Sequence, residues 1–152
     1  METLELAIAE HPFGKNLESR YLKMLAAGAA SVSFKKDQHI FREGELCDYT
    51  FLIITGKVAV DVYSPTKGAI TIQTLSDGEV LGWSWLIPPY RKHFDARALE
   101  VVHAVTIKGQ HLRDLCEKDH DFGYELLKRF IGIVANRLQK TRLQLIDLYG
   151  EN

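Results

Sequence analysis

The sequence is short of the features that mark secreted, disulfide-bonded and membrane-embedded proteins. Two of its 152 residues are cysteines, and Cys47 and Cys116 form no CxxC pair, which favours a reducing compartment. The longest apolar runs, such as 51–54, are far too short to span a bilayer. The acidic start of the chain lacks the bases of a secretory signal. We therefore expect a cytoplasmic protein that does not enter a membrane.

Neither sign of charge is in excess. Nineteen basic side chains stand against twenty acidic ones, so no net field attracts nucleic acid or an anionic membrane surface. Arg137, Lys140 and Arg142 form a small basic cluster, which we interpret first as the solvated face of a helix and only secondarily as a phosphate contact. No helix-turn-helix pattern follows before the sequence stops at Asn152. We expect this chain alone to bind no nucleic acid.

Sequence signatures of catalysis are also missing. The chain contains no GxSxG, P-loop, HExxH or GxGxxG pattern. Its six histidines never fall at a metal-ligand spacing such as HxH or HxxxH, which argues against the metal-dependent enzymes built on jelly rolls. We therefore predict that the protein is not an enzyme and has neither catalytic residues nor a metal site.

Hydrophobic periodicity divides the chain, which we expect to be one domain over 1–152, into three zones. Residues 1–30 show helical spacing, and Asn16 is suited to cap one of these helices. Residues 31–108 alternate with a period of two between turn sequences, which is typical of short antiparallel strands. Residues 109–150 are helical again. The predicted fold is mainly β with flanking helices: an antiparallel β-roll (a double-stranded jelly roll) with an N-terminal helix and a long C-terminal helix.

The C-terminal zone carries an apolar heptad seam on a helix that would be roughly 40 Å long. Such a helix is longer than the surface of a small β-roll, so its far end needs another cover. The helix belongs either to the core or to the seam of a two-fold dimer, and the length of the apolar stripe favours the dimer. The expected interface residues are Tyr124, Leu127, Ile131, Val134, Leu138, Leu145 and Leu148.

The segment 77–98 is the most informative stretch for function. Its glycine follows an expected strand and precedes a short helical turn over 84–87, and free N–H groups at a helix start suit an anionic ligand. Basic side chains just beyond the turn can add positive charge. Alternatively, the aromatic residues here simply pack the mouth of the roll, and the local sequence does not separate the two interpretations. The candidate ligand-binding residues are Gly82, Trp83, Ser84, Trp85, Arg91, Lys92, His93 and Arg97.

Several stretches follow a recurrent pattern with glycines at the turns of the roll: 11–13, 40–45, 51–58 and 75–82, followed by the long final helix. Together they extend over nearly the whole chain and resemble the cyclic nucleotide-binding domains of the bacterial catabolite-activator type, in the Crp/Fnr-like superfamily. The resemblance implies a β-roll of about eight strands, a phosphate-binding cassette over 82–94 and dimerisation through the last helix. It also implies a cyclic nucleotide or another phosphate-bearing ligand.

Two positions depart from the pattern of that family. The family has a glutamate directly after the cassette glycine, where it accepts a hydrogen bond from the ribose hydroxyl, whereas this chain has Trp83, whose indole only donates. The family then has an arginine, followed by serine or threonine and alanine, that holds the cyclic phosphate. Counting back from the last strand places Lys92 there, with Arg91 beside it, while Arg97 matches if the loop is longer. The sequence leaves open which of the three faces the pocket, and it predicts weak or absent binding of cAMP.

The DNA-binding domain of the family and the cysteines of its iron–sulfur branch have no counterpart in the sequence. We therefore expect a regulatory domain for signal transduction that senses a small anionic or nucleotide-like ligand and signals through a homodimer or a protein partner. The alternative is a degenerate β-roll without a ligand that acts as a dimeric interaction module. The sequence names neither the ligand nor the partner.

Overall fold

The structure, a computed structural model, describes residues 3–150 as two compact units, one ending at Leu115 and the other beginning at Cys116. Residues 1–2 and 151–152, which include both ends of the expected domain and part of its acidic start, lie outside the described residues. The first unit contains the strands and the N-terminal helices, and the second contains the long C-terminal helix.

Short helices begin the first unit: α1 (Thr3–Glu10), the 3-10 turn η1 (Pro12–Gly14) and α2 (Ser19–Ala26). The expected helix cap at Asn16 is wrong. Asn16 has a φ of 67°, and Glu18 occupies the N-cap position of α2. Because asparagine tolerates the left-handed region better than most residues do, it turns the chain before the helix starts.

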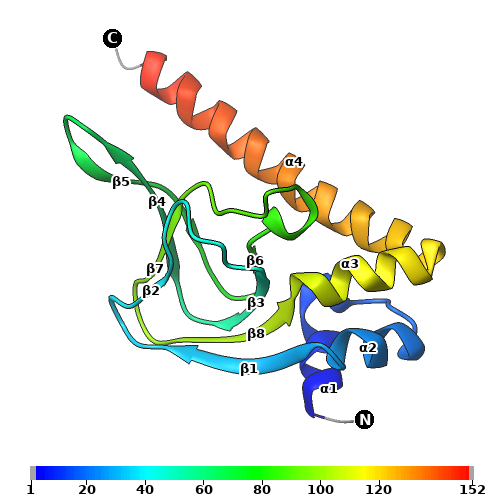
Figure 1. The fold of residues 1–152 in the computed structure, drawn as a ribbon. Coiled ribbons are helices and arrows are strands. Elements are labelled where there is room, and N and C mark those ends of the chain that lie inside the picture. The colour runs from blue at the N-terminus through cyan, green and yellow to red at the C-terminus, as the bar shows by residue number, and fades with distance from the viewer. Residues whose placement is uncertain (1–2, 151–152) are drawn as a thin grey trace. The chain divides into compact units, whose positions relative to one another are not determined.

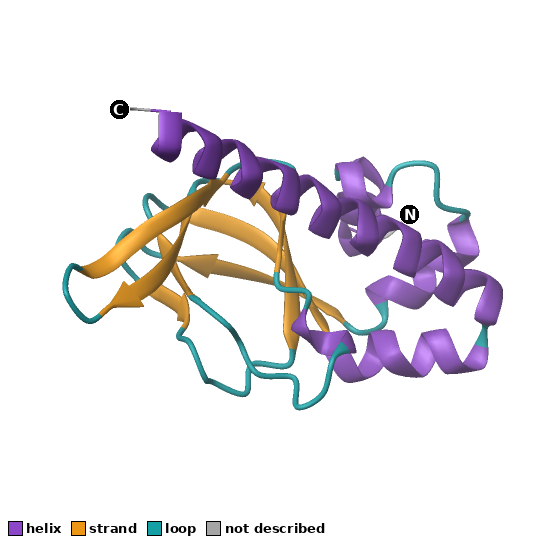
Figure 2. Ribbon diagram, turned by 90° about the horizontal axis from the view of Figure 1, so that it is seen from above, coloured by secondary structure: helices purple, strands orange, loops and turns teal. Residues whose placement is uncertain are grey.

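Eight strands in the described residues form two four-stranded antiparallel sheets (Figure 1, Figure 2). The first sheet has the order β1-β8-β3-β6 and the second has the order β2-β7-β4-β5. This confirms the mainly β fold with flanking helices. The strands are β1 (Ala29–Phe34), β2 (His39–Phe41), β3 (Tyr49–Thr55), β4 (Val58–Ser64), β5 (Gly68–Leu75), β6 (Val80–Leu81), β7 (Asp95–Ala98) and β8 (Val102–Lys108).

The core of the roll is built from the inward-facing side chains of both sheets. Val60 of β4 pairs with Ala96 of β7, and both are buried. Phe41 of β2 and Phe51 of β3 bring aromatic rings from the two sheets together, with centroids 6.4 Å apart. Residues that alternate along a strand face opposite sides of a sheet, so the neighbours of these core residues point outward. Arg97 lies between two buried residues of β7, so this alternation places its side chain on the outer face of the sheet.

Two helices complete the chain: α3 (Gly109–Lys118) and α4 (His120–Gly150). Within the second unit, a side-chain oxygen of Asp119 accepts a hydrogen bond from the backbone N–H of Phe122 at 3.0 Å. Asp119 therefore caps the start of α4, where negative charge is favoured. In the described part of the chain, 3–150, no helix has both the length and the apolar character needed to cross a membrane.

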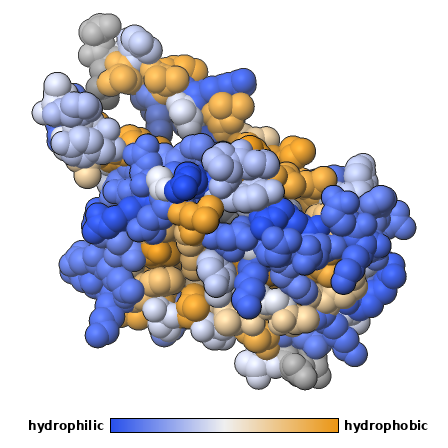
Figure 3. All heavy atoms as spheres, viewed as in Figure 1, coloured by the Kyte–Doolittle hydropathy of each residue, from blue (hydrophilic) through white to orange (hydrophobic). Residues whose placement is uncertain are grey.

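Most of the predicted seam of α4 is exposed. Ile131 and Leu148 are each 66% exposed, and Leu138 is 52% exposed, whereas Leu127 is partly buried. Figure 3 shows hydrophobic side chains on the surface of the C-terminal part of this helix, at the upper left. The seam residues therefore offer apolar surface to a partner, and their role in a dimer stays a prediction.

Candidate functional site

The candidate site begins where β6 ends. Gly82, the next residue, has a φ of 93°, a conformation that suits glycine. A Cβ atom at this position would lie 2.9 Å from Lys92 Nζ and 3.0 Å from the carbonyl oxygen of Tyr49. Both the backbone conformation and the close approach of these neighbours therefore require glycine here.

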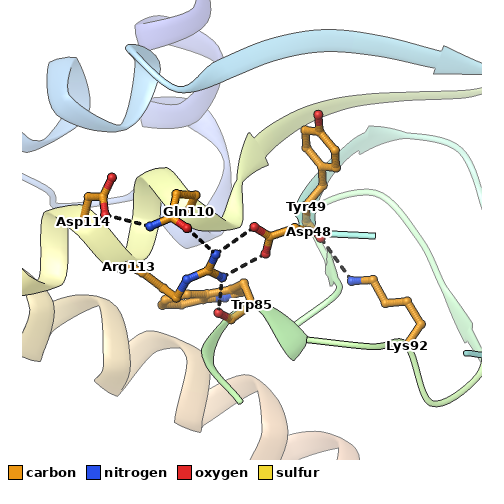
Figure 4. A network of polar contacts seen from close by, with 7 residues as sticks. All are labelled: Asp48, Tyr49, Trp85, Lys92, Gln110, Arg113 and Asp114. Carbon is orange, nitrogen blue, oxygen red and sulfur yellow. Dashed lines mark hydrogen bonds and ion pairs between the residues drawn. The ribbon is translucent and has the colours of Figure 1, made fainter. Parts of the chain in front are cut away.

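Lys92 lies beneath this glycine and is only 3% exposed. Its Nζ donates a hydrogen bond to the carbonyl oxygen of Tyr49 at 3.1 Å (Figure 4) and lies 4.7 Å from the centre of the Phe41 ring. Within residues 3–150, no carboxylate forms an ion pair with it. Burial lowers the pKa of Lys92, and the neighbouring Cys47 and Asp48 partly offset this effect. Lys92 is thus a buried cation that one carbonyl and one aromatic face stabilise only in part.

The other two candidate cations are engaged elsewhere. Arg91 is exposed, and its Nη1 donates to the carbonyl oxygen of Gly44 at 2.8 Å. Arg97 lies on β7 between two buried alanines and therefore faces the outer side of its sheet. There its Nε donates to Asp61 Oδ2 at 3.3 Å, and Asp37 lies 3.9 Å away. Of the three, Lys92 alone is buried beside Gly82.

The remaining candidate residues surround the glycine in sequence. The expected helical turn is present as a short 3-10 turn, η2 (Ser84–Leu86). Trp83 stacks on His93, with ring centroids 6.0 Å apart and planes inclined by 24°. Trp85 is 1% exposed, and Ser84 is buried with no hydrogen-bond partner for its hydroxyl oxygen among residues 3–150. A buried hydroxyl without a partner is unfavourable unless another group fills that role.

A network of hydrogen bonds that the sequence did not predict anchors the segment 82–94 to α3 (Figure 4). The Arg113 guanidinium of α3 makes two hydrogen bonds to the Asp48 carboxylate, at 2.9 and 2.8 Å, and donates to the carbonyl oxygen of Trp85 at 2.6 Å. It also packs over the Tyr90 ring at 4.1 Å. The hydrogen bond to Asp48 raises the pKa of Arg113. Asp48 and Arg113 are 65 residues apart, so no local sequence pattern could have predicted the pair.

Among residues 3–150, no group of three or more histidine, cysteine, aspartate or glutamate side chains could hold a metal ion. What the segment 82–94 offers instead is a buried ammonium, an unpaired hydroxyl and a stacked aromatic pair.

Comparison with known proteins gives one family. The family model of the cyclic nucleotide-binding domain matches residues 31–119. A CRP-like cAMP-activated global transcriptional regulator from two strains of Mycobacterium tuberculosis is 24% identical over 134 residues, which are 88% of this chain. The chain spans 58% of the length of these relatives.

Solved structures show the same fold. A protein from Geobacter metallireducens GS-15, assigned to the cyclic nucleotide-binding proteins, is 29% identical with a TM-score of 0.79, covering 91% of this chain and 99% of that one. A cyclic nucleotide-binding domain from Methylobacillus flagellatus KT is 19% identical with a TM-score of 0.80, covering 95% and 81%. The guanosine-bound regulatory subunit of a cAMP-independent protein kinase A from Trypanosoma cruzi is 18% identical with a TM-score of 0.74, covering 98% and 50%.

Proposed function

Because this chain belongs to the cyclic nucleotide-binding domain family, we propose that it senses a small anionic or nucleotide-like ligand at 82–94 and signals through a homodimer or a protein partner. The observation that carries the proposal is Lys92, which is 3% exposed and forms no ion pair within the described residues. A buried ammonium is unfavourable unless an opposite charge compensates it. An anionic group entering beside Gly82 supplies that charge.

Two further features fit an anionic ligand in this place. The unpaired hydroxyl of Ser84 can donate a hydrogen bond to a phosphate oxygen or another acceptor. Because Gly82 has no side chain, Lys92 Nζ can lie next to the backbone of this segment, which holds the ammonium at the site. Lys92 would neutralise the charge of the ligand, and Ser84 would help to orient it.

The ligand differs from cAMP in this proposal. At Trp83 the chain has an indole, which cannot accept a hydrogen bond from a ribose hydroxyl. The ring is also engaged in a stack with His93. A buried hydroxyl left without an acceptor weakens binding by roughly 5- to 150-fold. We therefore expect cAMP to bind poorly or not at all, while smaller anions or other nucleotides still bind.

A thermal-shift screen tests this function. The panel contains cAMP, guanosine, and sodium phosphate and sulfate at matched ionic strength. We expect phosphate and sulfate to raise the melting temperature, cAMP and the uncharged guanosine to raise it less or not at all, and Lys92→Met to abolish the response to the two anions. Lys67→Met, which removes an exposed lysine from the β4–β5 turn, is the matched control and should leave the response intact.

The outcomes separate this proposal from its alternative. A response to anions that survives Lys92→Met would place the ligand elsewhere. No response to any compound would favour the interaction module without a ligand. Calorimetric binding of cAMP in the micromolar range would overturn the predicted discrimination against it.

Dimerisation is the second part of the proposal, and the exposed apolar seam of α4 supports it. Leu138 and Leu145 are 52% and 49% exposed, an unfavourable arrangement for a free apolar stripe. We expect light scattering to give a dimer. The double substitution of Leu138 and Leu145 by aspartate should give a monomer, because charge in an apolar seam is strongly penalised. Substitution of the exposed Gln139 by aspartate is the control, and a monomeric unmodified protein at high concentration contradicts the proposal.

A further inference from the structure

A hollow of about 380 Å³ lies in the first unit, and its lining shares no residue with the cassette 82–94. Its lining includes four apolar residues, Ala7, Pro12, Ile53 and Ile54. A volume of this order is at the lower end of the range for small-molecule sites. The hollow therefore suits a ligand about as large as a single aromatic ring with a short chain.

The walls of this hollow are held by tertiary hydrogen bonds. His11 is 4% exposed, and its Nδ1 accepts a hydrogen bond from the backbone N–H of Phe13 at 3.0 Å. The Nδ1 atom therefore carries no proton, and Nε2 donates to the carbonyl oxygen of Ile53 at 3.1 Å. The backbone N–H of Gly78 donates to the same carbonyl oxygen at 2.9 Å. These bonds join the N-terminal helical region to β3 and to the β5–β6 turn, so the hollow is formed before any ligand arrives.

The charge of the lining has one sign. Glu10 and Asp77 contribute two carboxylates, and His11 is neutral because Nδ1 accepts a hydrogen bond. No lysine or arginine is among the described residues that line the hollow. Asp77 uses Oδ1 to accept a hydrogen bond from the backbone N–H of Gly56 at 2.8 Å, which holds this carboxylate in place. A cation next to an apolar group matches this surface, whereas an anion is repelled.

We propose that this hollow binds a small organic cation, an ammonium or guanidinium group that carries an alkyl or aryl substituent. The apolar part packs on Ile54 and Pro12, and the charged head lies near Glu10 and Asp77. The chemistry is opposite to that of the cassette, where the buried charge is the positive Lys92. The two sites therefore take different classes of ligand, and this inference does not depend on the function proposed above.

An NMR titration of the full chain tests the proposal with phenethylamine as the probe. We expect saturable shifts of the backbone amides of Ile53, Ile54 and Gly78. Phenethyl alcohol, which has the same shape without the charge, should bind several-fold more weakly. The anion 3-phenylpropionate should cause no shifts at these positions.

Two variants separate charge from shape. Glu10→Gln combined with Asp77→Asn keeps an acceptor for the Gly56 N–H and should weaken phenethylamine binding roughly five- to tenfold. Ala7→Met fills the hollow without changing its charge and should abolish binding. Glu100→Gln, which removes an exposed acid outside the hollow, is the control and should bind as the unmodified chain does.

Three outcomes would overturn the proposal. The first is an absence of shifts at these amides up to about 10 mM phenethylamine, a concentration that detects even weak sites. The second is equal affinity for the amine and the alcohol, which would show that the carboxylates do not contribute to binding of the ammonium group. The third is a change of the same amides when the protein alone is concentrated, which would mean that a second copy of the chain covers the hollow.

Discussion

Two connections between strands of this roll differ in almost every physical respect. The turn between β4 and β5 is three residues long, exposed and closed locally: the backbone N–H of Lys67 donates to Ser64 Oγ at 3.3 Å, and Gly68 has a φ of 75°. The connection between β6 and β7 runs over 82–94 and buries a lysine and a tryptophan. The first depends on its own sequence, whereas the second depends on partners far along the chain.

The difference shows where function can be built. A short exposed turn minimises the length of backbone that needs hydrogen-bonding partners. The longer connection contains a buried ammonium and an unpaired hydroxyl, which make it less stable than an apolar loop of the same length would be. Long, ordered connections of this kind are where binding sites usually lie. If this is so, substitutions in the longer connection should change the free energy of unfolding far more than substitutions in the short turn.

The largest effect should come from Trp85→Ala. The ring is 1% exposed, and its loss leaves a cavity between the connection and α3. We expect the free energy of unfolding to fall by about 3–5 kcal/mol. Thr66→Ala in the short turn should change it by less than about 0.5 kcal/mol. Urea denaturation measures both, and similar losses for the two variants would contradict the distinction.

The Arg113–Asp48 pair should give the next largest effect. Arg113→Ala removes two hydrogen bonds to a carboxylate and one to the Trp85 carbonyl, from a side chain that is 16% exposed. We expect a loss of about 2 kcal/mol in the free energy of unfolding. A double-mutant cycle with Asp48→Ala should show coupling, since both changes break the same contacts. Arg91→Ala, which removes an exposed arginine, is the control; additivity in the cycle would show that the network does not anchor the connection.

Lys92→Met should increase the free energy of unfolding, and this increase should be smaller than the losses expected above. It removes a buried charge and keeps the apolar stem, so we expect the free energy of unfolding at neutral pH to rise by about 1 kcal/mol. Burial lowers the pKa of Lys92 in the folded state below the usual lysine value of 10.5. The native state is therefore penalised while the lysine is protonated, and the penalty disappears as the pH rises through the folded pKa toward the unfolded one. The advantage of the variant should shrink over the same interval, and an advantage that does not change with pH would refute this explanation.

A substitution of His11 should have the smallest effect on stability. One of its hydrogen bonds is local, to Phe13, and the other is distant, to Ile53. Burial lowers the pKa of His11 below 6.5, and hydrogen bonds to Glu79 and Ile53 only partly offset this effect. The unfolded chain therefore binds a proton more readily, and the native state should lose stability as the pH falls below about 6.5, by at most about 1.4 kcal/mol per pH unit. His11→Gln should be less stable but should lack this part of the pH dependence. Denaturation at pH 5 to 8 compares the two, and parallel pH profiles would contradict the prediction.

The family and the order of the elements were largely predictable from the sequence. Turn glycines and the period of two indicated a β-roll, and the resemblance to cyclic nucleotide-binding domains is confirmed by the matching family model over 31–119. These features are local. A turn requires its glycine at one position, and the alternation of a strand extends over only a few residues. The error at Asn16 is of the same kind: a residue suited to a cap is also suited to a turn.

The sequence predicted which segment contains the candidate site, but not which of its side chains are buried together. The sequence alone places Arg91, Lys92 and Arg97 within seven residues and marks Gly82 as a close approach. The pairing of β7 with β4 turns Arg97 outward to Asp61, and the packing of the connection buries Lys92. Sequence determines which side chains are present and which local conformations they favour. Only tertiary structure decides which charge is buried, because burial depends on contacts with residues such as Tyr49, which lies 43 positions away along the chain.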